Sequence, residues 1–139
     1  MAKRDPMHFF MPIQVPTATQ QEKKLGVRNG KPFTYPSEKW ERARDELKSR
    51  LESHRPESPI EKGVPVVLTV TWCFPTKGHA DGTPHVGKPD TDNLDKGLKD
   101  IMTELGWWAD DAQVFSEHIT KIHSRYEGVR IDIERVEGE

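Results

Sequence analysis

Carboxylates and lysines are concentrated in the stretch Lys88-Pro89-Asp90-Thr91-Asp92-Asn93-Leu94-Asp95-Lys96. Asp90 and Asp92 are separated by one residue, and Lys96 follows four residues after Asp92. A second carboxylate pair, Asp110-Asp111, comes shortly afterwards. Three carboxylates from two elements, together with a lysine, would form a hard, oxygen-rich and anionic pocket that suits Mg²⁺ or Mn²⁺. The residue types therefore indicate divalent-cation chemistry.

An amphipathic helix is predicted to position these side chains. Its apolar residues recur at offsets of 0, 4, 7, 8 and 11, one stripe at the helical period, and are Leu94, Leu98, Ile101, Met102 and Leu105. Asp92 or Asn93 can cap the first turn, and Gly106 is placed to end the helix in a left-handed conformation. With the stripe buried, Asp92 and Lys96 would lie on the open face. A turn at Gly106 would then allow the second carboxylate pair to return toward the same site.

The aspartates do not by themselves require a cation site. Capping and the helix dipole alone can account for an Asp-rich helix start. An EF-hand is excluded, because Leu94 would occupy the fifth loop position and the required glycine and closing glutamate are absent. The Asp-x-Asp of aspartyl phosphatases usually ends a hydrophobic strand, and Val86-Gly87-Lys88-Pro89 is not one. A cation site and a simple helix cap both remain as interpretations.

The two halves of this pattern together resemble the RusA family of Holliday junction resolvases. The family pattern is an Asp-x-Asp-Asn-Leu-x-Lys helix start followed by Asp-Asp-[Ala/Ser]-Gln-Val, and the chain has both, at 90–96 and 110–114. The resemblance covers roughly residues 88–136. It implies that Asp90, Asp92 and Asp111 bind Mg²⁺, for which Mn²⁺ can substitute. Asp110 is the runner-up for the third ligand, and Lys96 is the essential basic residue.

The resemblance also implies an activity. The implied enzyme is a Mg²⁺-dependent, structure-specific endodeoxyribonuclease that resolves four-way DNA junctions in recombination and repair by paired nicking. The resemblance further implies a homodimer without an organic cofactor. Phage or prophage origin is an expectation from the family. The alternatives are a junction-binding architectural protein without cleavage activity, a general metal-dependent flap or fork nuclease, and a phosphatase. The complete set of aspartates and lysine favours an active enzyme.

Length and composition predict one domain over residues 1–139. The net charge of −2 is segregated, at +5 for residues 1–89 and −7 for residues 90–139. Either the basic first part faces phosphates, or the surface charge is simply uneven. A single cysteine, Cys73, excludes an intramolecular disulfide and a multi-cysteine zinc site. No apolar run reaches membrane-spanning length. We therefore expect a cytoplasmic protein of a bacterial host cell.

The first part of the chain is predicted to contain two strands and a helix. Strands are expected over Met7–Val15 and Val66–Phe74, where apolar residues alternate, and a helix from a Ser37 cap to about Glu52. Between the first strand and the helix, Thr17–Tyr35 reads as a polar loop. Its residues Lys23, Lys24, Arg28 and Lys31, near Phe33 and Tyr35, are either a contact surface for phosphates and bases or simply solvated.

The Gly-rich loop Pro75–Pro89 is predicted to deliver the chain to Asp90. His85 could touch a metal, a phosphate or only solvent, and Lys88 is close enough to the carboxylates to reach a phosphate. Downstream, Trp107 and Trp108 adjoin the site as core, dimer-interface or base-stacking residues.

Two strands, Ala112–Ser124 and Val129–Val136, are expected to form a hairpin through Tyr126-Glu127-Gly128. Lys121 and Arg125 project from the first of them and either bind phosphate or face solvent. The order strand, helix, strand, helix, strand, strand predicts a two-layer α+β domain, a mixed sheet with helices on one face.

Overall fold

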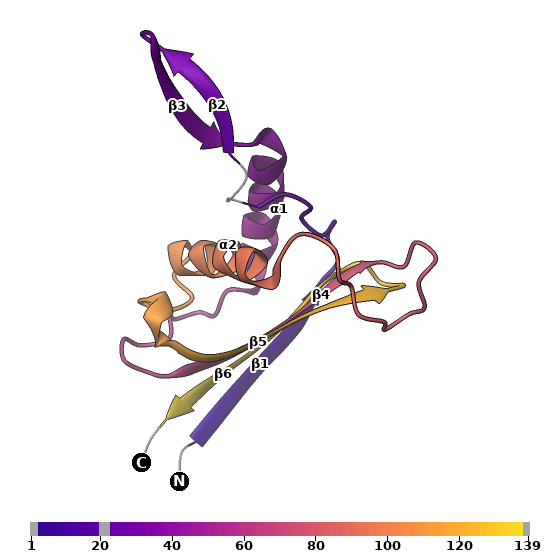
Figure 1. Cartoon of the computed structure of the whole chain (residues 1–139). Helices are drawn as coiled ribbons and strands as arrows, with labels where there is room; N and C mark the ends of the chain where they lie inside the picture. The colour runs from indigo at the N-terminus through magenta and orange to yellow at the C-terminus, as the bar shows by residue number, and fades with distance from the viewer. Residues whose placement is uncertain (1–2, 20–22, 138–139) are drawn as a thin grey trace.

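A computed structural model describes residues 3–19 and 23–137 of the chain. Its main sheet contains β1 (Lys3–Met11), β6 (Gly128–Glu137), β4 (Val66–Pro75) and β5 (Val114–Ser124), in that order. The β4–β5 pair is parallel and the other pairs are antiparallel. The helices α1 (Glu38–His54) and α2 (Thr91–Glu104) both lie on one face of this sheet (Figure 1). The predicted two-layer α+β fold is therefore confirmed.

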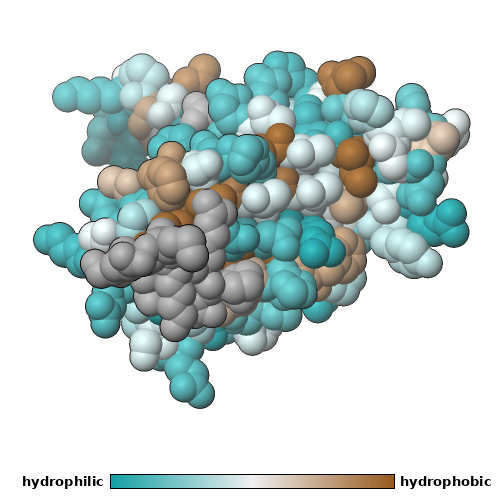
Figure 2. Space-filling view, turned by 90° about the horizontal axis from the view of Figure 1, so that it is seen from below, coloured by the Kyte–Doolittle hydropathy of each residue, from teal (hydrophilic) through white to brown (hydrophobic). Residues whose placement is uncertain are grey.

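The central strand β4 organises the core, as its alternating pattern predicted. Val66, Leu68, Val70 and Trp72 are fully buried, whereas Val67, Thr69 and Thr71 on the other face are only partly covered. The partly covered side of the sheet is turned toward the viewer of Figure 2, where hydrophobic residues are scattered among hydrophilic ones. The helices thus bury one face, and the aspartates lie on the helical side.

The two helices pack directly against each other. Ser37 caps α1 as predicted, because its Oγ accepts a hydrogen bond from the Trp40 N–H at 3.1 Å. Trp40 is a core residue, and a Cβ added to Gly97 of α2 would lie 2.8 Å from its ring. Glycine at position 97 therefore lets the helices approach. Glu104 at the end of α2 pairs with Arg44 and Lys48 of α1.

The expected C-terminal hairpin is wrong. β4 lies between β5 and β6 and pairs with both, so the three-residue connection at 125–127 passes the end of β4 instead of joining neighbouring strands. The physical reason is burial: β4 is apolar on one face and half-buried on the other, so it gains more as a central strand than at an edge. The turn signal identified the reversal but not the pairing partner.

Two further expectations at the N-terminal end need correction. β1 ends at Met11, before Pro12, which has no N–H to donate, although Ile13 and Val15 are still buried in the core. The segment Thr17–Tyr35, expected to be a polar loop, instead contains a β-hairpin that begins at Lys23. Residues 20–22 of this segment lie outside the described residues.

This hairpin pairs β2 (Lys23–Arg28) with β3 (Lys31–Pro36) in a separate two-stranded sheet. Asn29 and Gly30 between the strands have φ of 52° and 75°. Positive φ at both central residues is the requirement of a type I′ turn, and Asn-Gly is its preferred sequence. The hairpin projects away from the main sheet beyond the end of α1 (Figure 1).

Candidate active site

The first two candidate ligands lie at the N-terminus of α2. The N-cap is Asp90, where the sequence predicted Asp92 or Asn93, and its backbone carbonyl accepts from the Leu94 N–H at 3.1 Å. The Asp90 carboxylate makes no capping bond and instead lies 3.1 Å from Lys88 Nζ. Asp92, in the first turn, is exposed. Both carboxylates are thus presented at the surface and not consumed by the helix start.

The loop before α2 is fastened to the end of β5. Lys121 Nζ donates to the Gly87 carbonyl at 2.6 Å and to the Pro89 carbonyl at 2.9 Å. The backbone adds a bond from the His85 N–H to the Lys121 carbonyl at 3.0 Å. Lys121, predicted as a phosphate ligand or a solvated side chain, therefore holds the residues that precede Asp90. Arg125, the other cation of this strand, pairs with Asp81 at 3.4 Å.

Three histidines from this loop and β5 stack beside the site. The His85 ring lies parallel to Phe74 at 3.8 Å between centroids, and His79 lies parallel to His123 at 4.0 Å. Burial, and then the nearby Lys121, lower the pKa of His85. These residues line a cleft of about 660 Å³ that also contains Lys77 and Lys88. His85 is accordingly packed on an aromatic ring, whereas the sequence left a metal, a phosphate or solvent as its partner.

Lys96 stands on the open face of α2, as predicted. Its side chain is 59% exposed and pairs with Asp100, further along the helix, at 3.8 Å. The next lysine, Lys99, faces the sheet and lies 3.3 Å from Asp95 and 3.0 Å from Glu117 of β5. Burial, and then the neighbouring Glu117, raise the pKa of Asp95 to about 6. Lys96 is therefore the lysine of α2 that is available to a substrate.

The second carboxylate pair is divided by its local structure. Asp110 caps the short 3-10 helix η1 (Asp111–Gln113), with Oδ1 accepting from the Ala112 N–H at 2.9 Å. Gln113 completes the capping box, since its Oε1 accepts from the Asp110 N–H at 3.0 Å. The Asp111 side chain makes no hydrogen bond or ion pair with any residue that the structure describes. The free carboxylate at 111 fits a ligand better than the structurally occupied one at 110.

Gln113 has a further role that the sequence did not reveal. Its Nε2 donates to the carbonyls of Glu61 and Val64, at 2.8 and 3.0 Å. Gln113 thereby holds the turn that carries Asp110 and Asp111 against the segment that leads into β4. It was visible in the Asp-Asp-Ala-Gln-Val motif, but nothing in the motif indicated what the amide would bind.

Asp111 does not return to the N-terminus of α2 within one chain. Lys121 near the end of β5 contacts Pro89, and Glu117 contacts Lys99, so α2 runs opposite to β5. Asp111 lies just before β5, which begins at Val114. The seven residue steps from Val114 to Lys121 span about 23 Å along the strand. Over residues 3–19 and 23–137, no group of three or more Asp, Glu, His or Cys is arranged to hold a metal ion.

The turn at Gly106 explains this separation. Gly106 has φ of 80°, and the Trp107 N–H donates to Met102 while the Gly106 N–H donates to Thr103, both at 3.0 Å. This is the left-handed helix end that was predicted. It leads directly into Trp107 and Trp108, which are both fully buried core residues. The chain is thereby anchored at the C-terminal end of α2.

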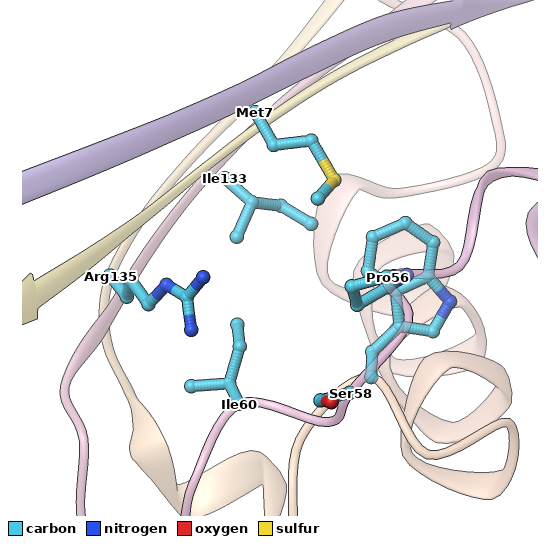
Figure 3. A pocket seen from close by; sticks show the side chains of 7 residues that line it. Met7, Pro56, Ser58, Ile60, Ile133 and Arg135 are labelled. Carbon is cyan, nitrogen blue, oxygen red and sulfur yellow. The ribbon is translucent and has the colours of Figure 1, made fainter.

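The remaining candidate residues lie elsewhere. The candidate phosphate-contacting residues Lys23, Lys24, Arg28 and Lys31 all belong to the β2–β3 hairpin. A cavity of about 70 Å³ between Met7, Ile60, Trp107 and Ile133, into which Arg135 extends, is too small for a nucleotide (Figure 3). In the part of the chain that is described, no helix is long and apolar enough to cross a membrane.

Comparisons with known proteins identify the family of the chain. The family described as Endodeoxyribonuclease RusA matches residues 14–134. The "Crossover junction endodeoxyribonuclease rusA" of Lactococcus phage r1t is 33% identical over 91 residues, which are 65% of this chain and 70% of that protein. The family match includes both carboxylate elements, the start of α2 and η1. The chain belongs to the RusA family of endodeoxyribonucleases.

Proposed function

We propose that this chain is a Mg²⁺-dependent endonuclease that resolves Holliday junctions in recombination and repair. The observation that carries the proposal is the pair Asp90 and Asp92, exposed at the start of α2 with neither side chain used as a helix cap. The name of the phage relative supports a junction as the substrate. Family membership supports phosphodiester hydrolysis in DNA.

The donor chemistry fits a divalent cation. Carboxylate oxygens are the ligands that Mg²⁺ and Mn²⁺ prefer, and Asp90, Asp92 and Asp111 offer them without a competing capping bond. When bound, the metal activates water and stabilises the leaving oxygen in phosphodiester hydrolysis. Lys88, paired with Asp90, holds a positive charge beside the first of these ligands.

Lys96 supplies positive charge where the substrate develops negative charge. Its ammonium is exposed one helical turn beyond Asp92, on the face of α2 that looks away from the core. From there it can neutralise negative charge on the reacting phosphate, a contribution that is strongest in the transition state. Its pair with Asp100 is long and exposed, so it costs little to release.

Two copies are needed to assemble such a site. One chain has two ligands at the start of α2 and the third beyond its other end, about 20 Å away over the length of the helix. A homodimer in which two α2 helices meet in opposite directions would place Asp90 and Asp92 of one copy beside Asp111 of the partner subunit. Two-fold symmetry would generate two identical sites, which suits paired nicking of a two-fold symmetric junction.

One experiment tests this function against its alternatives. Cleavage of a four-way junction, a flap, a linear duplex and a phosphomonoester is compared with Mg²⁺, with Mn²⁺ and with a chelator. We expect divalent-dependent, symmetric cleavage of the junction above all. Equal cleavage of the flap would indicate a general branched-DNA nuclease, release of phosphate from the monoester a phosphatase, and tight junction binding without any cleavage an architectural protein.

A further inference from the structure

The β2–β3 hairpin has two chemically different faces. Its register pairs Lys24 with Tyr35, Gly26 with Phe33 and Arg28 with Lys31, so these six residues share one face. All of its long cations except Lys23, and both of its aromatic rings, lie on that face. Leu25 and Val27 occupy the opposite face and are 77% and 74% exposed. The sequence pattern thus separates an aromatic and cationic face from an aliphatic one.

The two rings on the first face form one continuous surface. Phe33 and Tyr35 lie 5.7 Å apart between centroids, and the Arg28 guanidinium carbon is 5.1 Å from the Phe33 centroid. A Cβ at Gly26 would come within 2.7 Å of the Phe33 ring, so only glycine lets the ring lie flat across the opposite strand. The ring arrangement is therefore built into the hairpin.

The hydrophobic core of the protein does not use these rings. Phe33 and Tyr35 are 37% and 39% exposed, and neither belongs to the buried cluster over the main sheet. Figure 1 shows the hairpin extending away from the sheet and the helices. Aromatic rings flanked by cations, on an element that projects into solvent, have the composition of a surface that stacks unpaired bases and follows a phosphate backbone.

We propose that the Phe33–Tyr35 face of this hairpin binds unpaired or unstacked bases at the branch point of DNA. In this arrangement Phe33 and Tyr35 stack on bases, while Lys24, Arg28 and Lys31 contact the adjoining phosphates. The proposal rests on the proposed function and adds a specificity element to it. Stacking discriminates branched or bulged DNA from fully paired DNA, because the bases inside a continuous duplex have no accessible face.

Binding is measured in Ca²⁺, which suppresses cleavage of the DNA while retaining a divalent cation. The ligands are a four-way junction, a duplex with a three-base bulge and a fully paired duplex, with 2-aminopurine at the branch point or bulge. We expect Phe33→Ala and Tyr35→Ala each to weaken binding of the junction and the bulge by roughly 5- to 100-fold and the duplex far less. The 2-aminopurine signal should change on binding of the wild type and not of these variants.

Matched variants separate stacking from other effects. Leu25→Ser and Val27→Ser alter the aliphatic face and should leave all three affinities unchanged. Lys31→Gln should weaken all three DNAs to a similar degree and reduce the salt dependence. Phe33→Trp keeps an aromatic ring, and binding of the bulge should quench the emission of the new indole. The native tryptophans Trp40, Trp72, Trp107 and Trp108 are buried, so bound bases should not quench their emission.

The outcomes distinguish the hairpin from the overall function. Unchanged junction affinity in Phe33→Ala and Tyr35→Ala, or an equal loss for paired duplex, would overturn the stacking role and leave the proposed function intact. If the wild type stacks on the bulge through these rings but neither prefers nor cleaves the junction, the hairpin role stands and the proposed function fails. Wild-type affinity in Phe33→Trp supports stacking. If the bulge binds this variant without altering its indole emission, the result opposes stacking.

Discussion

Lys121 donates a hydrogen bond to the backbone carbonyl of Pro89 across 2.9 Å, and Pro89 immediately precedes Asp90. A lysine near the end of β5 thereby sets the position of the first candidate ligand on α2. Its second bond, to Gly87 at 2.6 Å, holds the loop in two places. Because its donors face carbonyls of its own chain, we predict that this lysine positions the loop and does not bind a phosphate.

Lys121→Met should slow cleavage of bound junction by roughly 10- to 100-fold, because small displacements of a reacting group carry costs of this size. The variant should also need more Mg²⁺ for half-maximal rate, with junction affinity in Ca²⁺ nearly unchanged. Lys77→Met is the matched control, since Lys77 lies in the loop that Lys121 holds, lines the histidine cleft and does not donate to another described residue. If Lys121→Met instead loses affinity and lowers the salt dependence by about one charge, Lys121 is a phosphate ligand.

Asp110 and Asp111 should respond differently to the same substitution. Asp111→Asn removes a carboxylate that no other described group uses, so cleavage should be abolished while junction binding stays intact or tightens. Asp110→Asn should be milder, because asparagine is an equally good N-cap for η1. Single-turnover cleavage rates in Mg²⁺ rank the two variants. A more severe defect in Asp110→Asn would reassign the third ligand to Asp110.

Lys96→Ala should lose roughly 10²- to 10³-fold in the rate of cleavage of bound junction, the scale for removing one preorganised donor to developing charge. Junction affinity in Ca²⁺ should barely change. Asp100→Asn is the control, because it removes the ion pair of Lys96 and keeps the lysine. A comparable defect in Asp100→Asn would assign Lys96 a structural role, and an unaltered rate for Lys96→Ala at saturating protein would refute the catalytic one.

Asp95 should make the protein less stable as the pH rises. Burial, followed by Glu117, raises the pKa of Asp95 to about 6 in the folded chain from an ordinary value of 3.8. An acid with a raised folded pKa gives its full stabilising contribution below its unfolded pKa, and this is lost as the pH rises through the folded value. Asp95→Asn stays neutral, so its Tm should exceed that of the wild type at about pH 8, and the gap should narrow toward pH 4.

The exposed Asp45→Asn on α1 controls for the lost charge in that experiment. Lys99 keeps Glu117 as a partner at 3.0 Å in Asp95→Asn, so the variant does not leave the half-buried ammonium of Lys99 unpaired. A Tm difference that does not depend on pH would show that Asp95 is ionised without penalty in the folded protein.

The local elements of the site could be predicted from the sequence, and their pairing in space could not. The apolar stripe of α2 and its end at Gly106 are encoded within one helix, where spacing determines which side chains share a face. The position of β5 beside β4 depends on which strand can bury more surface, a comparison across the whole chain. Spacing alone therefore suggested a hairpin of β5 and β6 that does not form.

The same limit applies to the third candidate ligand. Gly106 reverses the chain as expected, and from this the sequence suggested that Asp110 or Asp111 could return toward the start of α2. The direction of β5, which carries Asp111 to the other end of α2, follows from parallel pairing with β4 and could not be deduced from the loop. The β2–β3 hairpin, in contrast, had a readable signal in Asn29-Gly30, which the polar composition of its strands concealed.

The most direct test of the shared site is to mix two inactive proteins. Asp92→Asn and Asp111→Asn are each expected to be inactive alone. In an equimolar mixture, half of the randomly formed dimers contain one copy of each, and each mixed dimer has one intact site, made from the unaltered Asp92 of one copy and the unaltered Asp111 of the other. We predict that mixing restores about one quarter of the wild-type nicking activity in Mg²⁺, as single-strand nicks without paired resolution. No restored nicking, in a mixture shown to exchange subunits, would contradict a site shared between two copies.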